Sequence, residues 1–77
     1  MSEEILCRFG LAIRKLRQER RISQESLADM CGLHRTYISD VELGKRNVSL
    51  ENIEKMAFAF DMRISELFNE VEKYDSV

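Results

Sequence analysis

Residues 23–44 read SQESLADMCGLHRTYISDVELG and contain the signals for two short helices separated by a tight turn. Ser23 is a preferred N-cap residue, and Gly32 stands where a helix ends on a residue with a left-handed backbone. A second helical pattern starts soon after this glycine and stops at Gly44. The segment therefore predicts one helix over residues 24–31 and another that ends near residue 43.

Two helices joined by about three residues, with a glycine in the turn, form a helix-turn-helix motif. Ala28 must be small because the second helix crosses close to its backbone, and Ile38 and Val41 hold that helix on the first. Apolar positions alone would arise in any helical hairpin. The joint spacing of Ala28, Gly32 and Ile38 is more specific, so we assign the motif to residues 24–43.

Three further amphipathic segments flank the motif. Apolar residues recur every three or four positions from Ile5 to Leu16, and Ser49 precedes a helical stripe that ends at Phe60. A last stripe covers residues 64–74. No segment shows the alternation of a β-strand over a useful length. We expect an all-α fold, a compact bundle of five helices.

Size and composition limit the class of protein. The chain has 77 residues, 44% hydrophobic and 34% charged, which predicts one globular domain over residues 1–77. The longest apolar run, 56–60, is far too short to span a bilayer. The acidic start of the chain, followed by Arg8, is unlike a secretory signal, so we expect a cytoplasmic protein with no membrane partner.

The charge is unevenly distributed. The net charge of −2 argues against nucleic-acid binding when the chain is taken as a whole. Residues 1–46, however, carry nine basic and seven acidic side chains (+2), whereas residues 47–77 carry three basic and seven acidic ones (−4). Charges act mainly within a Debye length of about 10 Å. A basic face can therefore bind phosphates although the total is acidic.

Catalytic and metal-binding patterns are missing from the sequence. Cys7 and Cys31 cannot form a disulfide framework, and two cysteines with the single His34 make a poor zinc set. Cys31 occupies an apolar position of the motif, so an inert buried thiol is expected. There is no glycine-rich phosphate loop. We predict no enzyme activity, no metal, no cofactor and no small-molecule effector.

The exposed face of the second motif helix carries residues that helix propensity does not favour. Ser, Thr and Asp are indifferent helix formers, whereas an ordinary solvated face more often shows Glu, Lys and Gln. The same side chains suit base edges, since arginine pairs with guanine and aspartate accepts from the cytosine amine. The residues predicted to read bases are Arg35, Thr36, Ser39 and Asp40.

Donor side chains lie at both ends of the motif and suit the DNA backbone. Gln24 would lie beside the free backbone N–H groups of a helix N-terminus. Tyr37 can equally be a packing residue with its hydroxyl at the surface, and Ser49 can also cap the next helix. The predicted phosphate contacts are Gln24, Tyr37, Lys45, Arg46, Asn47 and Ser49.

The stretch from Ile13 to Leu50 resembles the Cro/phage-repressor (Xre-type) helix-turn-helix family. The shared residues are Arg17, Gln24, Leu27-Ala28, Gly32, Ile38-Ser39 and Glu42-Leu43-Gly44-Lys45. This resemblance implies a lambda-repressor-like domain. Within the family, residues 35–39 and 46–50 are similar to the controller proteins of restriction–modification systems. Those are small homodimers that bind operator DNA upstream of their own gene and the endonuclease gene.

The resemblance also implies a structural ion pair between Arg17 and Glu42, which would tether the recognition helix to the first helix. Two positions depart from the family pattern. His34 occupies the N-cap of the recognition helix, where Ser, Thr or Asp is usual, so this cap is expected to be weak. Leu43 replaces a residue that is often polar, which puts a carried-over contact there in doubt.

The last stripe has more apolar surface than the core of so small a chain needs. We place Ile64 and Phe68 in the core, with the 64–74 helix serving dimerisation. The alternative is a fully intramolecular fifth helix. A dimer would set two recognition helices about 34 Å apart on a palindrome. The residues predicted at the dimer interface are Phe58, Leu67, Val71 and Tyr74.

The sequence thus predicts a transcriptional regulator that binds double-stranded operator DNA as a homodimer, with two dimers on adjacent operators as a further expectation. A phage-type repressor or an antitoxin would share the fold. An antitoxin implies a protein partner, and the acidic end formed by Glu66, Glu70, Glu72 and Asp75 could supply its surface. A helical protein-interaction module that no longer binds DNA is the alternative from another class.

Overall fold

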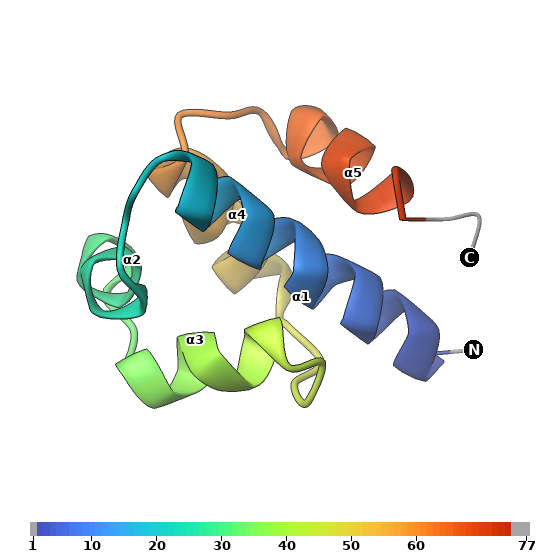
Figure 1. Cartoon of the computed structure of the whole chain (residues 1–77), viewed down its shortest axis with the longest axis horizontal. Helices are drawn as coiled ribbons and strands as arrows, with labels where there is room; N and C mark the ends of the chain where they lie inside the picture. The colour runs from blue at the N-terminus through green and yellow to red at the C-terminus, as the bar shows by residue number, and fades with distance from the viewer. Residues whose placement is uncertain (1, 75–77) are drawn as a thin grey trace.

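The computed structural model describes residues 2–74 and contains five helices and no strand over that range (Figure 1). The helices are α1 (Ser2–Glu19), α2 (Gln24–Cys31), α3 (Arg35–Glu42), α4 (Leu50–Ala59) and α5 (Ile64–Glu72). This confirms the all-α, five-helix prediction. Asp75, one of the acids assigned to a partner surface, lies outside the described residues. Over 2–74 the helices are too short or too polar to cross a bilayer.

The long first helix organises the bundle. α1 contacts α3 on one side and α5 on the other, while α2 packs against α3 and α4 (Figure 1). Each helix turns its apolar stripe inward, which removes that surface from water. The buried apolar residues are Phe9, Ala12, Ile13, Leu16, Leu27, Ala28, Cys31, Ile38, Val41, Met56, Ala57, Phe60, Leu67 and Val71.

The ends of the short helices follow the local signals. The Ser23 hydroxyl accepts a hydrogen bond from the Ser26 N–H at 3.0 Å, and the α2 C-cap, Gly32, has a φ of 68°. Ser49 caps α4 by accepting from the Asn52 N–H at 3.1 Å. At the N-cap of α3, His34 makes no side-chain capping bond, as expected for a weak cap.

Gly10 sets the distance between α1 and α3. A Cβ built on this residue would lie 2.7 Å from the carbonyl oxygen of Glu42 and would also collide with that of Val41. The missing side chain lets α1 cross directly over the last turn of α3. Helix propensity alone treats Gly10 as a weak helix former, whereas the structure shows that it allows the close contact between α1 and α3.

The fifth helix packs with a different face from the one predicted. Leu67 and Val71 have no exposed surface within the single chain, so the prediction that they form dimer contacts is wrong. Ile64, placed in the core by the sequence, is 39% exposed. The apolar stripe over residues 64–74 is continuous, so the sequence does not show which side of this helix packs against α1. Leu67 and Val71 lie one turn apart on the same side of α5, while Ile64, its first residue, lies beside the exposed Leu50 and Phe58 of α4.

The remaining aromatic residues of this region divide between core and surface. Phe68 is half-buried and its ring lies 5.8 Å from that of Phe9, in agreement with its predicted place in the core. Tyr74 is also half-buried against the core. Phe58 on α4 is 83% exposed and stays available for a partner.

Candidate nucleic-acid interface

The residues predicted to read bases lie together on the outer side of α3. Arg35 and Thr36 are exposed, and Ser39 and Asp40, one turn later, are half-buried. The opposite side of the helix carries the buried Ile38, Val41 and Glu42. Positions separated by three or four residues share a helix face, so these four side chains form one continuous stripe. We call this stripe, Arg35, Thr36, Ser39 and Asp40, the readout face.

A buried ion pair fixes α3 from behind. The Arg17 guanidinium donates from Nε to Oε2 of Glu42 at 2.7 Å and from Nη2 to Oε1 at 3.1 Å. These side chains are only 13% and 4% exposed, respectively. Arg17 also donates from Nη1 to the Ile22 carbonyl at 3.0 Å. The ion pair predicted between helix one and the end of the recognition helix is thereby confirmed.

Gln24 joins this network at the start of α2. Its Nε2 donates to Oε1 of Glu42 at 3.0 Å, so one carboxylate receives donors from α1 and from α2. The side chain is half-buried. The sequence treats Gln24 as a phosphate ligand and does not anticipate this tertiary contact. Its contact with phosphate stays a prediction.

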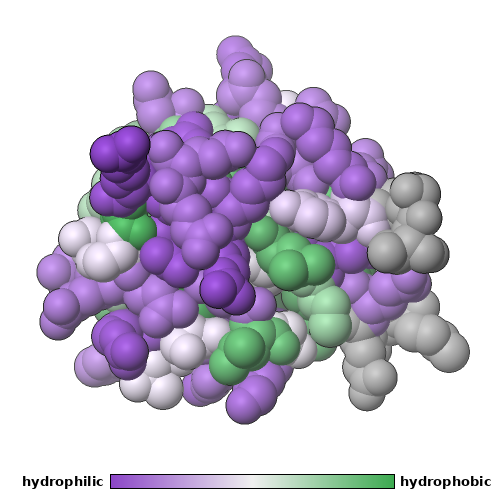
Figure 2. All heavy atoms as spheres, in the orientation of Figure 1, coloured by the Kyte–Doolittle hydropathy of each residue, from purple (hydrophilic) through white to green (hydrophobic). Residues whose placement is uncertain are grey.

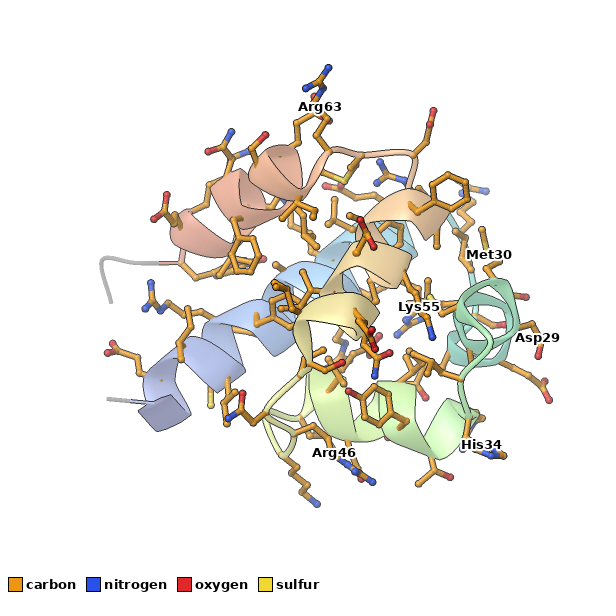
Figure 3. The ribbon with its side chains drawn as sticks, turned by 180° about the vertical axis from the view of Figure 1, so that it is seen from behind. Asp29, Met30, His34, Arg46, Lys55 and Arg63 are labelled. Atoms are coloured by element: carbon orange, nitrogen blue, oxygen red, sulfur yellow. The ribbon has the colours of Figure 1, made fainter. Side chains whose placement is uncertain are left out.

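The loop between α3 and α4 presents the other predicted phosphate ligands. Lys45, Arg46 and Asn47 are all exposed, and we call this segment the basic loop. The Ser49 oxygen accepts the capping bond of α4, which leaves its hydroxyl hydrogen free to donate. Figure 3 shows Arg46 and His34 at opposite ends of α3, so the basic loop flanks one end of the readout face.

Four side chains connect the readout face, the basic loop and α4. The Arg46 guanidinium lies 5.1 Å from the centre of the Tyr37 ring, and its Nε lies 3.4 Å from Oδ2 of Asp40. Asn52, in the first turn of α4, donates from Nδ2 to the Tyr37 hydroxyl at 3.1 Å. We call these four residues the Arg46 cluster. Sequence reasoning missed Asn52, because nothing in its local pattern shows that α4 brings it to Tyr37.

A hollow lies between α1, α2 and α3 beside the readout face. Its lining includes Arg14 of α1 and Leu43, which is 59% exposed. Arg14 therefore adds a cation to the candidate interface that is not among the predicted contacts. Leu43, the departure from the family pattern, thus puts an apolar side chain at the edge of the same surface. Hydrophilic side chains dominate the face shown in Figure 2.

The described residues give no sign of a metal or thiol centre. Among residues 2–74, no group of three His, Cys, Asp or Glu side chains could hold a metal ion. Burial raises the pKa of the Cys31 thiol, which keeps it protonated and unreactive. The site itself consists of a polar helix face, a buried ion pair behind it and a basic loop beside it. That combination defines a helix-turn-helix DNA-binding protein.

Comparisons with known proteins agree with this class. Residues 13–67 match the family model described as helix-turn-helix. The control protein C.MunI of Mycoplasma sp. is 49% identical over 71 residues, 91% of this chain and 96% of the relative. The chain belongs to the helix-turn-helix family and, within it, is similar to the controller proteins of restriction–modification systems.

Two solved structures show the same likeness. The restriction–modification controller protein C.AhdI from Aeromonas hydrophila is 51% identical and superposes with a TM-score of 0.79, covering 82% of this chain and 96% of that one. The controller protein C.Esp1396I was solved as a tetramer in complex with its natural 35 base-pair operator. It is 30% identical, with a TM-score of 0.82 and coverages of 90% and 91%.

Proposed function

We propose that this protein is a transcriptional regulator, the controller of a restriction–modification system, that binds palindromic operator DNA as a homodimer in the cytoplasm. The observation that carries this proposal is the readout face, a polar stripe on the outer side of α3, which the Arg17–Glu42 pair connects to α1. The operator complex of the relative C.Esp1396I supports it. Such a regulator acts by binding, so no residue is assigned a catalytic role.

The proposed contacts follow the chemistry of the side chains. Arg35 is suited to bidentate pairing with guanine and Asp40 to accepting from a cytosine amine. Lys45 and Asn47 donate to phosphates beside the major groove, with Arg46 completing the basic loop. Phosphate contacts set the register of the protein on the duplex, whereas base contacts carry the specificity.

The proposed dimer surface keeps Phe58 from the predicted interface but cannot include the buried Leu67 and Val71. Leu50 and Phe58 on α4 are 75% and 83% exposed, and Ile64 follows at the start of α5. Ile64 lines two hollows, one shared with Leu50 and the other with Phe58, and Glu54 borders both. We call these apolar residues, Leu50, Phe58 and Ile64, the α4–α5 patch. Apolar side chains this exposed mark an interaction surface.

A second copy of the chain is the occupant that suits this patch. The acidic Glu54 and the basic Arg63 both border it. In a two-fold interface each residue faces the partner's equivalent surface, so a patch with both signs of charge can complement itself. The dimer would place two α3 helices about one DNA turn, roughly 34 Å, apart. This spacing is what reading a palindrome requires.

Selection of bound fragments from random duplexes at a stated salt concentration tests the function. Arg35→Ala is expected to cost about 1–3 kcal/mol on the selected duplex and to relax one base preference. Arg46→Ala is expected to weaken binding to the selected duplex and to flatten its salt dependence by about one unit, because one phosphate contact is lost. Lys55→Ala removes an exposed charge elsewhere and serves as the control. Unchanged binding in both arginine variants would instead support a protein-interaction module.

A further inference from the structure

The Arg46 cluster contains an acid that a DNA-binding surface should avoid. Asp40 places a carboxylate on the readout face, where it would meet the negative potential of the duplex. In the free protein this charge is balanced by Arg46, whose Nε lies 3.4 Å from Oδ2 of Asp40. The same guanidinium is a proposed phosphate ligand. In the free protein, the Asp40 carboxylate thus binds the guanidinium that would contact phosphate, and the Arg46 guanidinium binds the carboxylate that would contact a base.

The structure provides a resting position for Arg46. Its guanidinium lies over the Tyr37 ring, 5.1 Å from the ring centre. Asn52 of α4 fixes this ring by donating a hydrogen bond of 3.1 Å from Nδ2 to the Tyr37 hydroxyl. The arginine side chain is 49% exposed and that of Asp40 is 29% exposed. Ion pairs this open to water are weak, so the pair can separate at low cost once each partner finds another.

We propose that Asp40 is a specificity-determining residue that exchanges partners on the operator, an inference that rests on the proposed function. On non-specific DNA, Asp40 keeps Arg46 paired and away from the phosphates. On the operator, a cytosine amino group in the major groove donates to the Asp40 carboxylate. Arg46 is then released to a phosphate. Base readout and backbone contact are coupled through a single ion pair, so the wrong base loses both.

The test compares two duplexes: the one that the wild-type protein selects from a random library, and a scrambled duplex of the same length and composition. Asp40→Asn keeps the shape of the side chain but loses the charge that holds Arg46. We expect binding to the scrambled duplex to tighten about fivefold, the upper range for releasing an exposed ion pair, with a salt dependence steeper by about one unit because one more phosphate is contacted. The ratio of selected to scrambled affinity should fall by at least as much.

Two further variants separate partner exchange from simple charge repulsion. Asp61→Asn makes the same charge change in the turn after α4, at a position whose φ of 57° asparagine also tolerates. It should leave both affinities within about twofold of wild type. In an Arg46→Ala background, Asp40→Asn should no longer change the salt dependence, because no arginine is left to release.

Three outcomes decide the matter. The proposal is overturned if Asp40→Asn leaves scrambled binding unchanged, or if it steepens the salt dependence equally with and without Arg46. If the wild-type protein selects no duplex at all, the proposed function itself fails. Circular dichroism of each variant confirms folding, which we expect since Asp40 is only half-buried.

Discussion

The contact between Arg17 and Glu42 is the residue-scale feature on which the interface depends most. Two charges are removed from water and satisfied by two hydrogen bonds between them, of 2.7 and 3.1 Å, with Gln24 adding a third to the same carboxylate. The desolvation of such a pair offsets much of its attraction. Its main effect is therefore positional, since it holds the end of α3 on α1.

Single and double replacements of this pair should differ in a characteristic way. Arg17→Met or Glu42→Leu alone is expected to lower the free energy of unfolding by about 3–5 kcal/mol, because each leaves a buried charge without its partner. The double variant should lose less than either single one. Urea unfolding at one fixed protein concentration measures this. Additive losses in the double variant would contradict the assignment.

At the scale of the helices, the crossing of α1 over α3 decides how the readout face is presented. Helix propensity alone predicts that Gly10→Ala stabilises α1 by up to about 1 kcal/mol. The structure predicts the opposite, a loss of about 1–3 kcal/mol, since the new Cβ would lie 2.7 Å from the Glu42 carbonyl oxygen. Thermal unfolding decides the sign. Gln18→Ala, an exposed change on the same helix, is the control.

We expect the contact between α1 and α5 to weaken in acid, because it includes the carboxylate of Glu70. Glu70 Oε2 accepts from Lys73 Nζ at 2.9 Å and Oε1 from Lys15 Nζ at 3.2 Å. The hydrogen bond from Lys73 and then the one from Lys15 lower the pKa of Glu70 below its ordinary value of 4.5. A carboxyl group with a lowered pKa stabilises the fold fully at pH values above its ordinary pKa. This stabilisation is lost as the pH falls through the lowered pKa.

Glu70→Gln should therefore reduce the loss of stability in acid. We expect the wild-type melting temperature to fall further than that of the variant between neutral pH and a pH below the lowered pKa of Glu70. Melting curves across this range provide the measurement. Glu72→Gln removes an exposed charge from the same helix and should keep the wild-type acid response. Equal acid responses in wild type and Glu70→Gln would exclude this contact as the cause.

At the scale of the whole molecule, we propose that the α4–α5 patch forms the dimer interface. Phe58→Asp places a charge on a side chain that is 83% exposed in the single chain, so the fold should persist while the dimer weakens. We expect the dissociation constant to rise about 30-fold or more, the effect of losing an aromatic interface anchor. Sedimentation over a range of concentrations tests this.

Two control variants distinguish dimer loss from unfolding. Met30→Asp changes another exposed apolar residue, on α2, and should leave the dimer intact. Leu67→Asp is expected to unfold the chain, because Leu67 is fully buried. A dimer that survives Phe58→Asp would place the interface elsewhere.

Much of the fold could be read from local sequence. The predicted helix over residues 24–31 coincides with α2, and the caps at Ser23, Gly32 and Ser49 lie where the pattern puts them. Helix periodicity, capping side chains and a left-handed glycine act over one or two turns. The same periodicity predicted that Arg35, Thr36, Ser39 and Asp40 lie on the outer side of the second motif helix, while their contact with bases stays a prediction.

Features that join distant parts of the chain were not predictable in this way. The contacts of Gln24 with Glu42 and of Asn52 with Tyr37, and the choice of Leu67 over Ile64 for the core, depend on how the helices are rotated against one another. An apolar stripe shows that a helix has an inner side but not which neighbour covers it. Helix positions and the motif thus follow from short-range physics in the chain itself. The rotation of α5 and the side-chain networks around α3 are decided only by the tertiary structure, because all five helices must pack together into one close-packed core.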